Sequence, residues 1–171
     1  IVTFGFKHNK RYNSYYKVGI RTPFIEKLSD DVSEFNKINV IGYIEASEEM
    51  ETFVTSGVYE RYIMDENKLM YHHILDSSTG YPIDNNLISV SVFGSIESTK
   101  ADALSTAIFA MGLDEGMKYA NDNALSVIFI DWDKKIYLSD NARYRFVFND
   151  YLSNYGYSVE GMYGEDGFSY K

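Results

Sequence analysis

One helical pattern, enclosed by two apolar strand patterns, constrains the fold of this chain more than any other feature. From Ser98 to Met111, apolar side chains recur at helical spacing, and Gly112 follows where a helix would end. A second, shorter helix is predicted for residues 114–121. The runs Leu87–Phe93 and Leu125–Ile130 on either side are typical of strands. Mixed strands with a single helix pair predict an α+β fold, in which the pair packs on a mixed or antiparallel sheet.

Shorter patterns predict the remaining elements. Alternating runs indicate strands at residues 2–6, 15–20, 38–45, 51–55, 59–64, 69–75 and 136–138. Asp65–Lys68 is a hairpin turn signal, and Asp76–Asn86, rich in Ser, Asn and Asp, is predicted to be a loop. Residues 27–37 form a polar stretch without a predicted element. Residues 149–171, rich in Tyr and Gly without a period, are predicted to be a loosely ordered tail that follows a domain of residues 1–148.

The composition excludes several classes of protein. The 171 residues include 16 Lys and Arg against 25 Asp and Glu, a net charge of −9, which argues against a nucleic-acid partner. The absence of Cys excludes disulfide scaffolds, thiolate nucleophiles and Cys-based zinc sites. No apolar run approaches the ~20 residues that span a bilayer. At 45% hydrophobic residues, the chain can build a folded core.

Two of the three histidines, His72 and His73, lie just before the predicted loop. Adjacent residues on a strand point to opposite faces, so at most one of them faces a given site. That weakens a metal site built on both. Gly80 predicts a tight turn whose backbone can come close to a ligand. The alternative is a Ser/Thr/Gly turn with two surface histidines.

The helix carries a carboxylate and a hydroxyl one turn apart. Asp102 and Thr106 lie one above the other on one face, and Asp102 stands between two alanines, close to the apolar stripe. We therefore expect a buried carboxylate that something must satisfy. A hard cation would do so, because Mg²⁺ often takes one or two protein carboxylates and completes its shell with phosphates and water. The alternative is an Asp favoured by the helix dipole, with the Thr106 hydroxyl bonded back to the helix.

A third candidate is Thr55–Tyr62, in which small residues precede aromatic ones. Ser56 and Gly57 could face the phosphates or the ring edge of a ligand, and the alternative is ordinary hairpin decoration. The glycines form neither a dinucleotide-binding nor a P-loop motif, and no nucleophile elbow is present.

Taken in order, these segments resemble the FAD:protein FMN transferase family, the ApbE flavin transferases, whose older name is thiamine biosynthesis lipoprotein. The matching motifs are T-S-G-x-Y-E-R at residues 55–61, H-H-I-L-D-x-x-T-G-Y-P at 72–82 and A-D-A-L-S-T-A at 101–107. The resemblance covers about residues 15–138, which are similar to the C-terminal half of the family's catalytic domain. Ile1, which is not Met, is interpreted as a cut point, with the first half of the functional unit outside this chain.

The resemblance implies a defined chemistry. Members of this family bind FAD and a divalent cation, usually Mg²⁺. They transfer the FMN moiety onto a Thr or Ser hydroxyl of an acceptor flavoprotein and release AMP. The resemblance implies Asp102 and Thr106 as metal ligands, and His73 as the base that takes the proton from the acceptor hydroxyl. The implied contacts of the flavin nucleotide are Thr55, Ser56, Gly57, His72, Thr79 and Gly80.

The resemblance also implies a location and leaves alternatives open. The family is typically exported and often lipid-anchored, so an extracytoplasmic, membrane-associated lipoprotein is expected, with its anchor absent from this chain. The family's Gly-Gly-Asn run has no counterpart in Thr3–Phe6. That difference favours an alternative, a degenerate flavin- or nucleotide-binding module without transferase activity. A third interpretation, an extracellular interaction domain, rests on the acidic, Tyr-rich composition alone.

Overall fold

A six-stranded sheet forms the centre of the computed structural model, which describes residues 1–3, 7–8, 13–14, 16–25, 28, 32–47 and 49–160. Its strand order is β1-β6-β9-β10-β11-β13. The bounds are β1 (Val2–Thr3), β6 (Glu51–Gly57), β9 (Leu87–Gly94), β10 (Ser126–Asp131), β11 (Lys135–Leu138) and β13 (Ser158–Val159). Neighbouring strands are antiparallel except β11 and β13, which run parallel, so the sheet is mixed.

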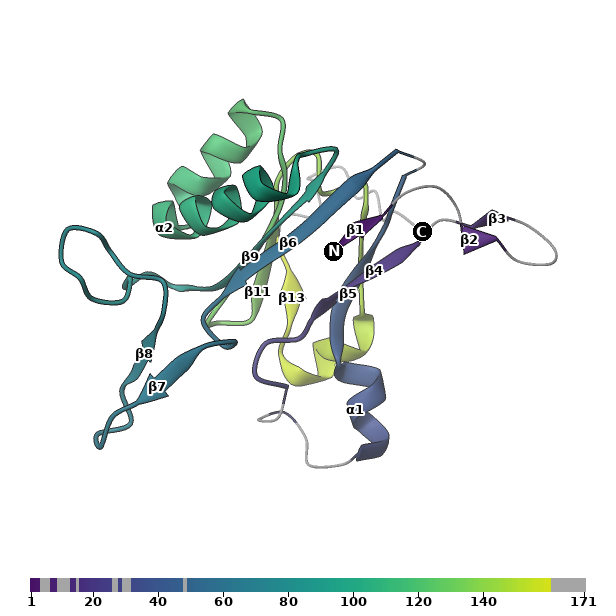
Figure 1. The fold of residues 1–171 in the computed structure, drawn as a ribbon. Helices are drawn as coiled ribbons and strands as arrows, with labels where there is room; N and C mark the ends of the chain where they lie inside the picture. Colours follow the sequence, from purple (N-terminus) through teal and green to yellow (C-terminus); the bar gives the residue numbers. More distant parts are fainter. Residues whose placement is uncertain are drawn as a thin grey trace.

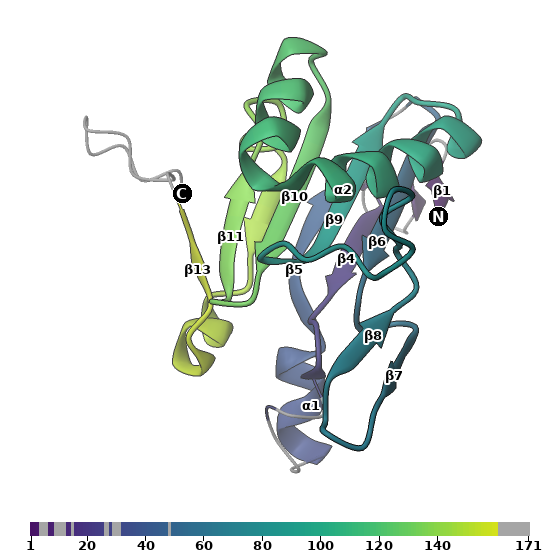
Figure 2. The ribbon, with the colours of Figure 1, turned by 90° about the vertical axis from the view of Figure 1, so that its left-hand side faces the viewer.

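This sheet lies between a helix and a smaller sheet (Figure 1). Helix α2 (Ser98–Asp122) packs against β6, β9 and β10 on one face, as the turned view in Figure 2 shows. The other face meets a three-stranded sheet in the order β12-β5-β4. Its strands are β4 (Lys17–Arg21), β5 (Val40–Glu45) and β12 (Phe146–Phe148). The remaining elements are β2 (Lys7–His8), β3 (Asn13–Ser14), α1 (Val32–Ile38), β7 (Tyr62–Met64), β8 (Met70–His72) and the 3₁₀ helix η2 (Asp150–Tyr155). The predicted α+β fold, with helix packed on a mixed sheet, is confirmed.

The central strand β9 separates two hydrophobic cores. Val90 and Val92 pack beneath α2 with Ile108 and Phe109. Phe93 points the other way, into the core between the two sheets. Because both faces of β9 are covered, the strand is buried from its first residue to its seventh. A strand in this position tolerates few charged residues, which explains its apolar sequence.

The predicted helix pair is one helical element with a kink at Gly112. The backbone there has φ of 80° and ψ of −177°, a conformation that belongs almost exclusively to glycine. The prediction that the first helix ends at this glycine is confirmed. The carbonyl of Phe109, in the last turn before the kink, accepts a hydrogen bond from Asn85 Nδ2 at 2.7 Å. A carbonyl at a helix end needs such an outside partner.

The structure corrects the prediction for the C-terminal segment up to residue 160. The segment is not loose there, because Leu152 is fully buried, Tyr157 is 3% exposed, and β13 pairs with β11. Its elements are too short to show a period in the sequence. The proposed boundary at residue 148 stays a prediction. Residues 161–171 of the expected tail, and residues 4–6 of the expected first strand, lie outside the described residues.

Other differences concern α1, β12 and the hairpin β7–β8. Helix α1 falls in the polar stretch for which no element was predicted, and its last residue, Ile38, was expected to begin a strand. Phe35 is 42% exposed while Ile38 is buried, so no continuous apolar stripe marks the helix. β12 was not predicted, and β7 begins only at Tyr62 because the residues before it form turns. Among the described helices, none combines the length and the apolar character that a membrane span requires.

Candidate functional site

Three hydroxyl groups meet where β6 runs along α2, and we call Ser56, Ser105 and Thr106 the hydroxyl cluster. Ser56 Oγ lies 2.7 Å from Ser105 Oγ and 3.0 Å from Thr106 Oγ1. Ser56 reaches the helix because its side chain points to the face of β6 that α2 covers. The structure thereby brings together two segments that the sequence presents as separate motifs, and it places Asp102 one helical turn before Thr106.

The two neighbours of Ser56 have different surroundings. Thr55 points to the opposite face of the strand, where its Oγ1 lies 2.7 Å from Ser91 Oγ. That pair lines a small cavity of 60 Å³ between the two sheets. At Gly57, an added Cβ would come within 2.7 Å of the Tyr59 ring, so any other residue would force that ring to shift. Of these three predicted flavin contacts, Ser56 is the one that joins the helix.

Asp102 is exposed, which corrects the expectation of a buried carboxylate beside the apolar face. The helix turns its side chain away from the core, so there is no desolvation penalty for a cation to relieve. Its backbone carbonyl accepts a hydrogen bond from Ser105 Oγ at 2.9 Å. Thr106 Oγ1 lies 3.4 Å from the same oxygen, the contact on which the alternative of a back-bonded hydroxyl depends.

The donor atoms at this point nevertheless fit a hard cation. Asp102, Thr106 and Ser56 offer oxygen atoms, which Mg²⁺ prefers as ligands. Across the described residues, no group of three or more His, Cys, Asp or Glu side chains could hold a metal ion. A single carboxylate with hydroxyls beside it therefore suits one half of a Mg²⁺ site, the other half of which a phosphate group and water would complete.

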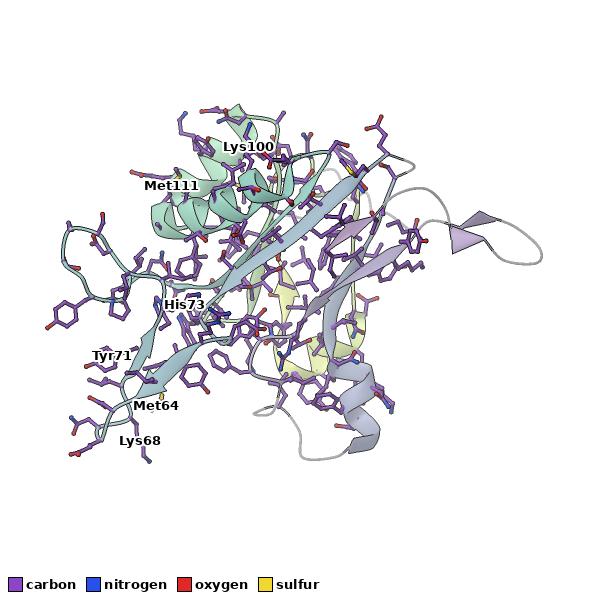
Figure 3. The ribbon with its side chains drawn as sticks, viewed as in Figure 1. Met64, Lys68, Tyr71, His73, Lys100 and Met111 are labelled. Carbon is purple, nitrogen blue, oxygen red and sulfur yellow. The ribbon has the colours of Figure 1, made fainter. Side chains whose placement is uncertain are left out.

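His73 presents a basic nitrogen at the surface. It is exposed, and its Nδ1 lies 3.2 Å from the carbonyl oxygen of Arg61. A carbonyl only accepts hydrogen bonds, so in the neutral ring Nδ1 carries the proton and Nε2 has the lone pair. Figure 3 shows His73 where the β7–β8 hairpin joins the main sheet, with Tyr71 and Met64 farther out along the hairpin. This geometry is suited to a general base.

His72 has the opposite environment. It is half-buried, and its Nε2 donates to the Ile83 carbonyl at 3.2 Å. Its other nitrogen, Nδ1, is buried and has no hydrogen-bond partner within the described part of the chain. Its ring meets Phe109 of α2 edge-on, with 6.1 Å between the ring centres. Burial lowers the pKa of His72 below its ordinary value, so the side chain is neutral and serves to pack the hairpin against the helix.

Two hollows flank β8 and the loop that follows. His72 and Trp132 are among the residues that line a hollow of 410 Å³. His73 and Gly80 are among those that line a second one of 580 Å³. Gly80 has a φ of 73°, which confirms the tight turn predicted from the sequence. Thr79 is exposed in the same loop but is not among the lining residues of either hollow.

Two residues that the sequence did not single out connect the loop and strand β6 to α2. Asn85 donates from Nδ2 to the carbonyl of Phe109 and accepts from the Leu87 backbone N–H at 3.1 Å through Oδ1. It therefore ties the loop that carries Gly80 to α2. The other residue is the buried Ser105. A hydroxyl three residues after Asp102 is the one signal that could have identified Ser105, and no comparable signal marks Asn85.

The chain is similar to known flavin transferases. Residues 1–129 match the model of the ApbE family. A protein of Klebsiella pneumoniae (strain 342) named FAD:protein FMN transferase is 33% identical over 132 residues, which are 77% of this chain and 37% of that protein. A protein of the same name from Treponema pallidum (strain Nichols) is 39% identical over 84 residues, 48% of this chain and 23% of that protein. The chain thus spans well under half the length of these relatives.

Solved structures show the same fold. The ApbE protein of Thermotoga maritima has a TM-score of 0.60 at 31% identity, over 77% of this chain and 38% of that one. The flavin transferase ApbE of Vibrio cholerae has a TM-score of 0.57 at 27% identity, again over 77% and 38% of the two chains. Both solved structures are matched over 77% of this chain and 38% of their own.

Proposed function

The chain belongs to the ApbE family, and from that premise we propose that it acts as an FAD:protein FMN transferase. In the proposed reaction, the FMN moiety of FAD moves onto a Thr or Ser hydroxyl of an acceptor flavoprotein, AMP is released, and Mg²⁺ is required. The names of the relatives support the reaction class. Because the chain spans 37% of the first of these relatives, the activity of this chain remains a proposal.

The contact between Ser56 and α2 carries the proposal. The motifs at residues 55–61 and 101–107 lie far apart in sequence, and the 3.0 Å contact between Ser56 and Thr106 joins them. An oxygen-rich junction of this kind suits a diphosphate held through a cation better than it suits an apolar ligand. Asn85 and His72 both contact Phe109, one turn farther along the same helix. The hydroxyl cluster and the loop that follows His72 are therefore both attached to the same helix, α2.

Each residue then has a defined task. Asp102 and Thr106 would hold Mg²⁺, which when bound neutralises charge on the diphosphate and orients it for in-line attack. His73 accepts the proton of the acceptor hydroxyl at Nε2, the nitrogen that its Nδ1 contact with Arg61 leaves available. The hydroxyl oxygen bonds to the FMN phosphorus while the bond from that phosphorus to the AMP phosphate oxygen breaks.

The test is a mass measurement on the acceptor. The full chain is incubated with FAD, Mg²⁺ and an acceptor flavoprotein, beside an acceptor whose target hydroxyl residue is replaced by Ala. We expect the first acceptor to gain the mass of FMN less one water, the second to gain nothing, and EDTA to stop the reaction. Asp102→Ala should abolish the transfer, because it removes the carboxylate, whereas Asp114→Ala, an exposed carboxylate beyond the kink, should not.

The same experiment separates the alternatives. FAD binding without any mass gain would favour the binding module without transferase activity. A chain that binds no FAD would exclude both flavin-based functions.

A further inference from the structure

Four oxygen–oxygen contacts connect the hydroxyl cluster with the backbone carbonyl of Asp102, but the groups involved supply only three hydrogens. Ser56 Oγ contacts Ser105 Oγ at 2.7 Å and Thr106 Oγ1 at 3.0 Å. The carbonyl oxygen of Asp102 lies 2.9 Å from Ser105 Oγ and 3.4 Å from Thr106 Oγ1. Each hydroxyl supplies one hydrogen and the carbonyl supplies none. One of the four contacts therefore has no hydrogen in it.

The distances identify that contact. Hydrogen bonds between oxygen atoms span about 2.5–3.0 Å, and the separation of 3.4 Å between Thr106 Oγ1 and the Asp102 carbonyl falls outside that range. The other three contacts fall within it. Ser105 then donates to the carbonyl, Ser56 donates to Ser105, and Thr106 donates to Ser56. The direction of every hydrogen bond in the cluster follows from this count.

We propose that Ser56 and Ser105 are positioning residues that hold the Thr106 hydroxyl with its hydrogen inward and its lone pairs toward the bound cation. The inference rests on the proposed function, because it takes Thr106 as a metal ligand. Thr106 is exposed and Ser105 is fully buried, so the chain of hydrogen bonds runs from the surface into the protein. A cation on the Thr106 oxygen makes its hydrogen a stronger donor to Ser56, so ion binding and hydrogen-bond direction support each other.

Ser105 acts on the cation without touching it, which makes the proposal testable. In Ser105→Ala, the Ser56 hydrogen has Thr106 as its remaining partner in the cluster. Thr106 must then turn its own hydrogen outward or toward the distant carbonyl, and its lone pairs are less available to the cation. In Ser56→Ala, Thr106 loses its acceptor. Because the two serines act in series, the double variant should bind no more weakly than either single variant.

The experiment measures Mn²⁺ binding to the full chain in the presence of FAD, by loss of the free-ion signal in electron paramagnetic resonance. We expect about threefold to tenfold weaker Mn²⁺ binding in Ser105→Ala and in Ser56→Ala, the equivalent of one net hydrogen bond. Ser56→Thr keeps the hydroxyl and should restore the affinity. FAD affinity without metal should be unchanged in Ser105→Ala. Ser91→Ala is the matched control, because it removes one hydroxyl of the Thr55–Ser91 pair, whose oxygen atoms lie 2.7 Å apart on the other face of the sheet.

The outcomes are distinct. If Thr106→Ala weakens Mn²⁺ binding but Ser105→Ala and Ser56→Ala do not, the positioning role is wrong and the proposed function stands. Additive losses in the double variant would also contradict it. If Asp102→Ala and Thr106→Ala both bind Mn²⁺ like the wild type, the metal site of the proposed function is wrong, and the positioning role fails with it. Circular dichroism confirms folding, and Ser56→Ala, at a half-buried position, provides the answer should Ser105→Ala not fold.

Discussion

The ion pair between Glu51 and Arg145 joins the two sheets, and its removal tests the packing on which the site depends. Glu51, at the start of β6, is 3% exposed. Its carboxylate accepts hydrogen bonds from Arg145 Nη1 at 2.6 Å and Nη2 at 2.8 Å, and from the Ser47 backbone N–H at 2.7 Å. Arg145 also donates to the carbonyl of Glu45 at 2.8 Å, at the end of β5. The pair thus connects the strand of Ser56 to the three-stranded sheet.

Glu51→Gln keeps the shape of the side chain and removes its charge. The amide has one acceptor oxygen, so it cannot accept both Arg145 bonds. A hydrogen bond to a charged group contributes about 1.5–3 kcal/mol, and breaking a fully buried ion pair costs about 3–5 kcal/mol. The Arg145 side chain keeps 27% of its surface exposed, so water compensates part of the loss. We therefore expect Glu51→Gln to lower the free energy of unfolding by about 2–3 kcal/mol.

Urea unfolding, followed by circular dichroism, measures this loss. With a slope of about 2 kcal/mol per molar urea, the midpoint should fall by about 1–1.5 M. The matched control is Asp122→Asn, which removes a carboxylate from the exposed pair with Lys118 on α2. Exposed pairs contribute little, so its midpoint should hardly move. Equal shifts in the two variants would refute the reasoning from burial.

The same pair predicts how stability depends on pH. Burial raises the pKa of Glu51, but the hydrogen bonds from Arg145 and Ser47, together with the Arg145 charge, outweigh burial and bring the pKa below its ordinary value. The unfolded chain therefore takes up the proton at a higher pH than the folded protein. The contribution is fully present above the ordinary pKa of 4.5 and is lost as the pH falls through the lower folded value. The difference in stability between wild type and Glu51→Gln should shrink over that range.

Three further substitutions test the helix and the histidine pair. Gly112→Ala should lower the free energy of unfolding by about 1–3 kcal/mol. The cost is backbone strain at a φ of 80° and not a clash, because no atom lies within 4 Å of the added Cβ. An unchanged urea midpoint would mean that the kink relaxes. His73→Ala should slow FMN transfer by ~10²-fold or more and spare FAD binding. His72→Ala should reduce thermal stability because it removes the contact with Phe109; if it slowed transfer as His73→Ala is expected to, His72 would be the base.

Features with a local cause could be predicted from the sequence. The helix from Ser98 shows its period within a few turns, and it ends at Gly112 because that residue alone tolerates the backbone conformation there. The strand patterns of β9 and β10 are equally local. The motifs also identified Ser56 and Thr106, which the structure brings into contact. Their roles, like that of His73, stay predictions.

Other features depended on contacts that no local pattern contains. Asp102 has alanine neighbours that suggest burial, yet the rotation of α2 on the sheet leaves it exposed. Leu152 belongs to a segment without a period and is buried because the core between the sheets receives it. The difference between His72 and His73 arises from two distant carbonyl groups, on Ile83 and Arg61, that fix which ring nitrogen carries the proton.

The sequence by itself therefore determined which kinds of element this protein forms and which stretches match the motifs of the family, because hydrophobic period, glycine conformation and residue type act over short stretches of chain. The tertiary structure alone decided which side chains are exposed, which hydroxyls meet and which imidazole nitrogen contacts a carbonyl. Burial and hydrogen-bond direction are set by partners far away in the sequence, as the joining of Ser56 to Ser105 and Thr106 shows.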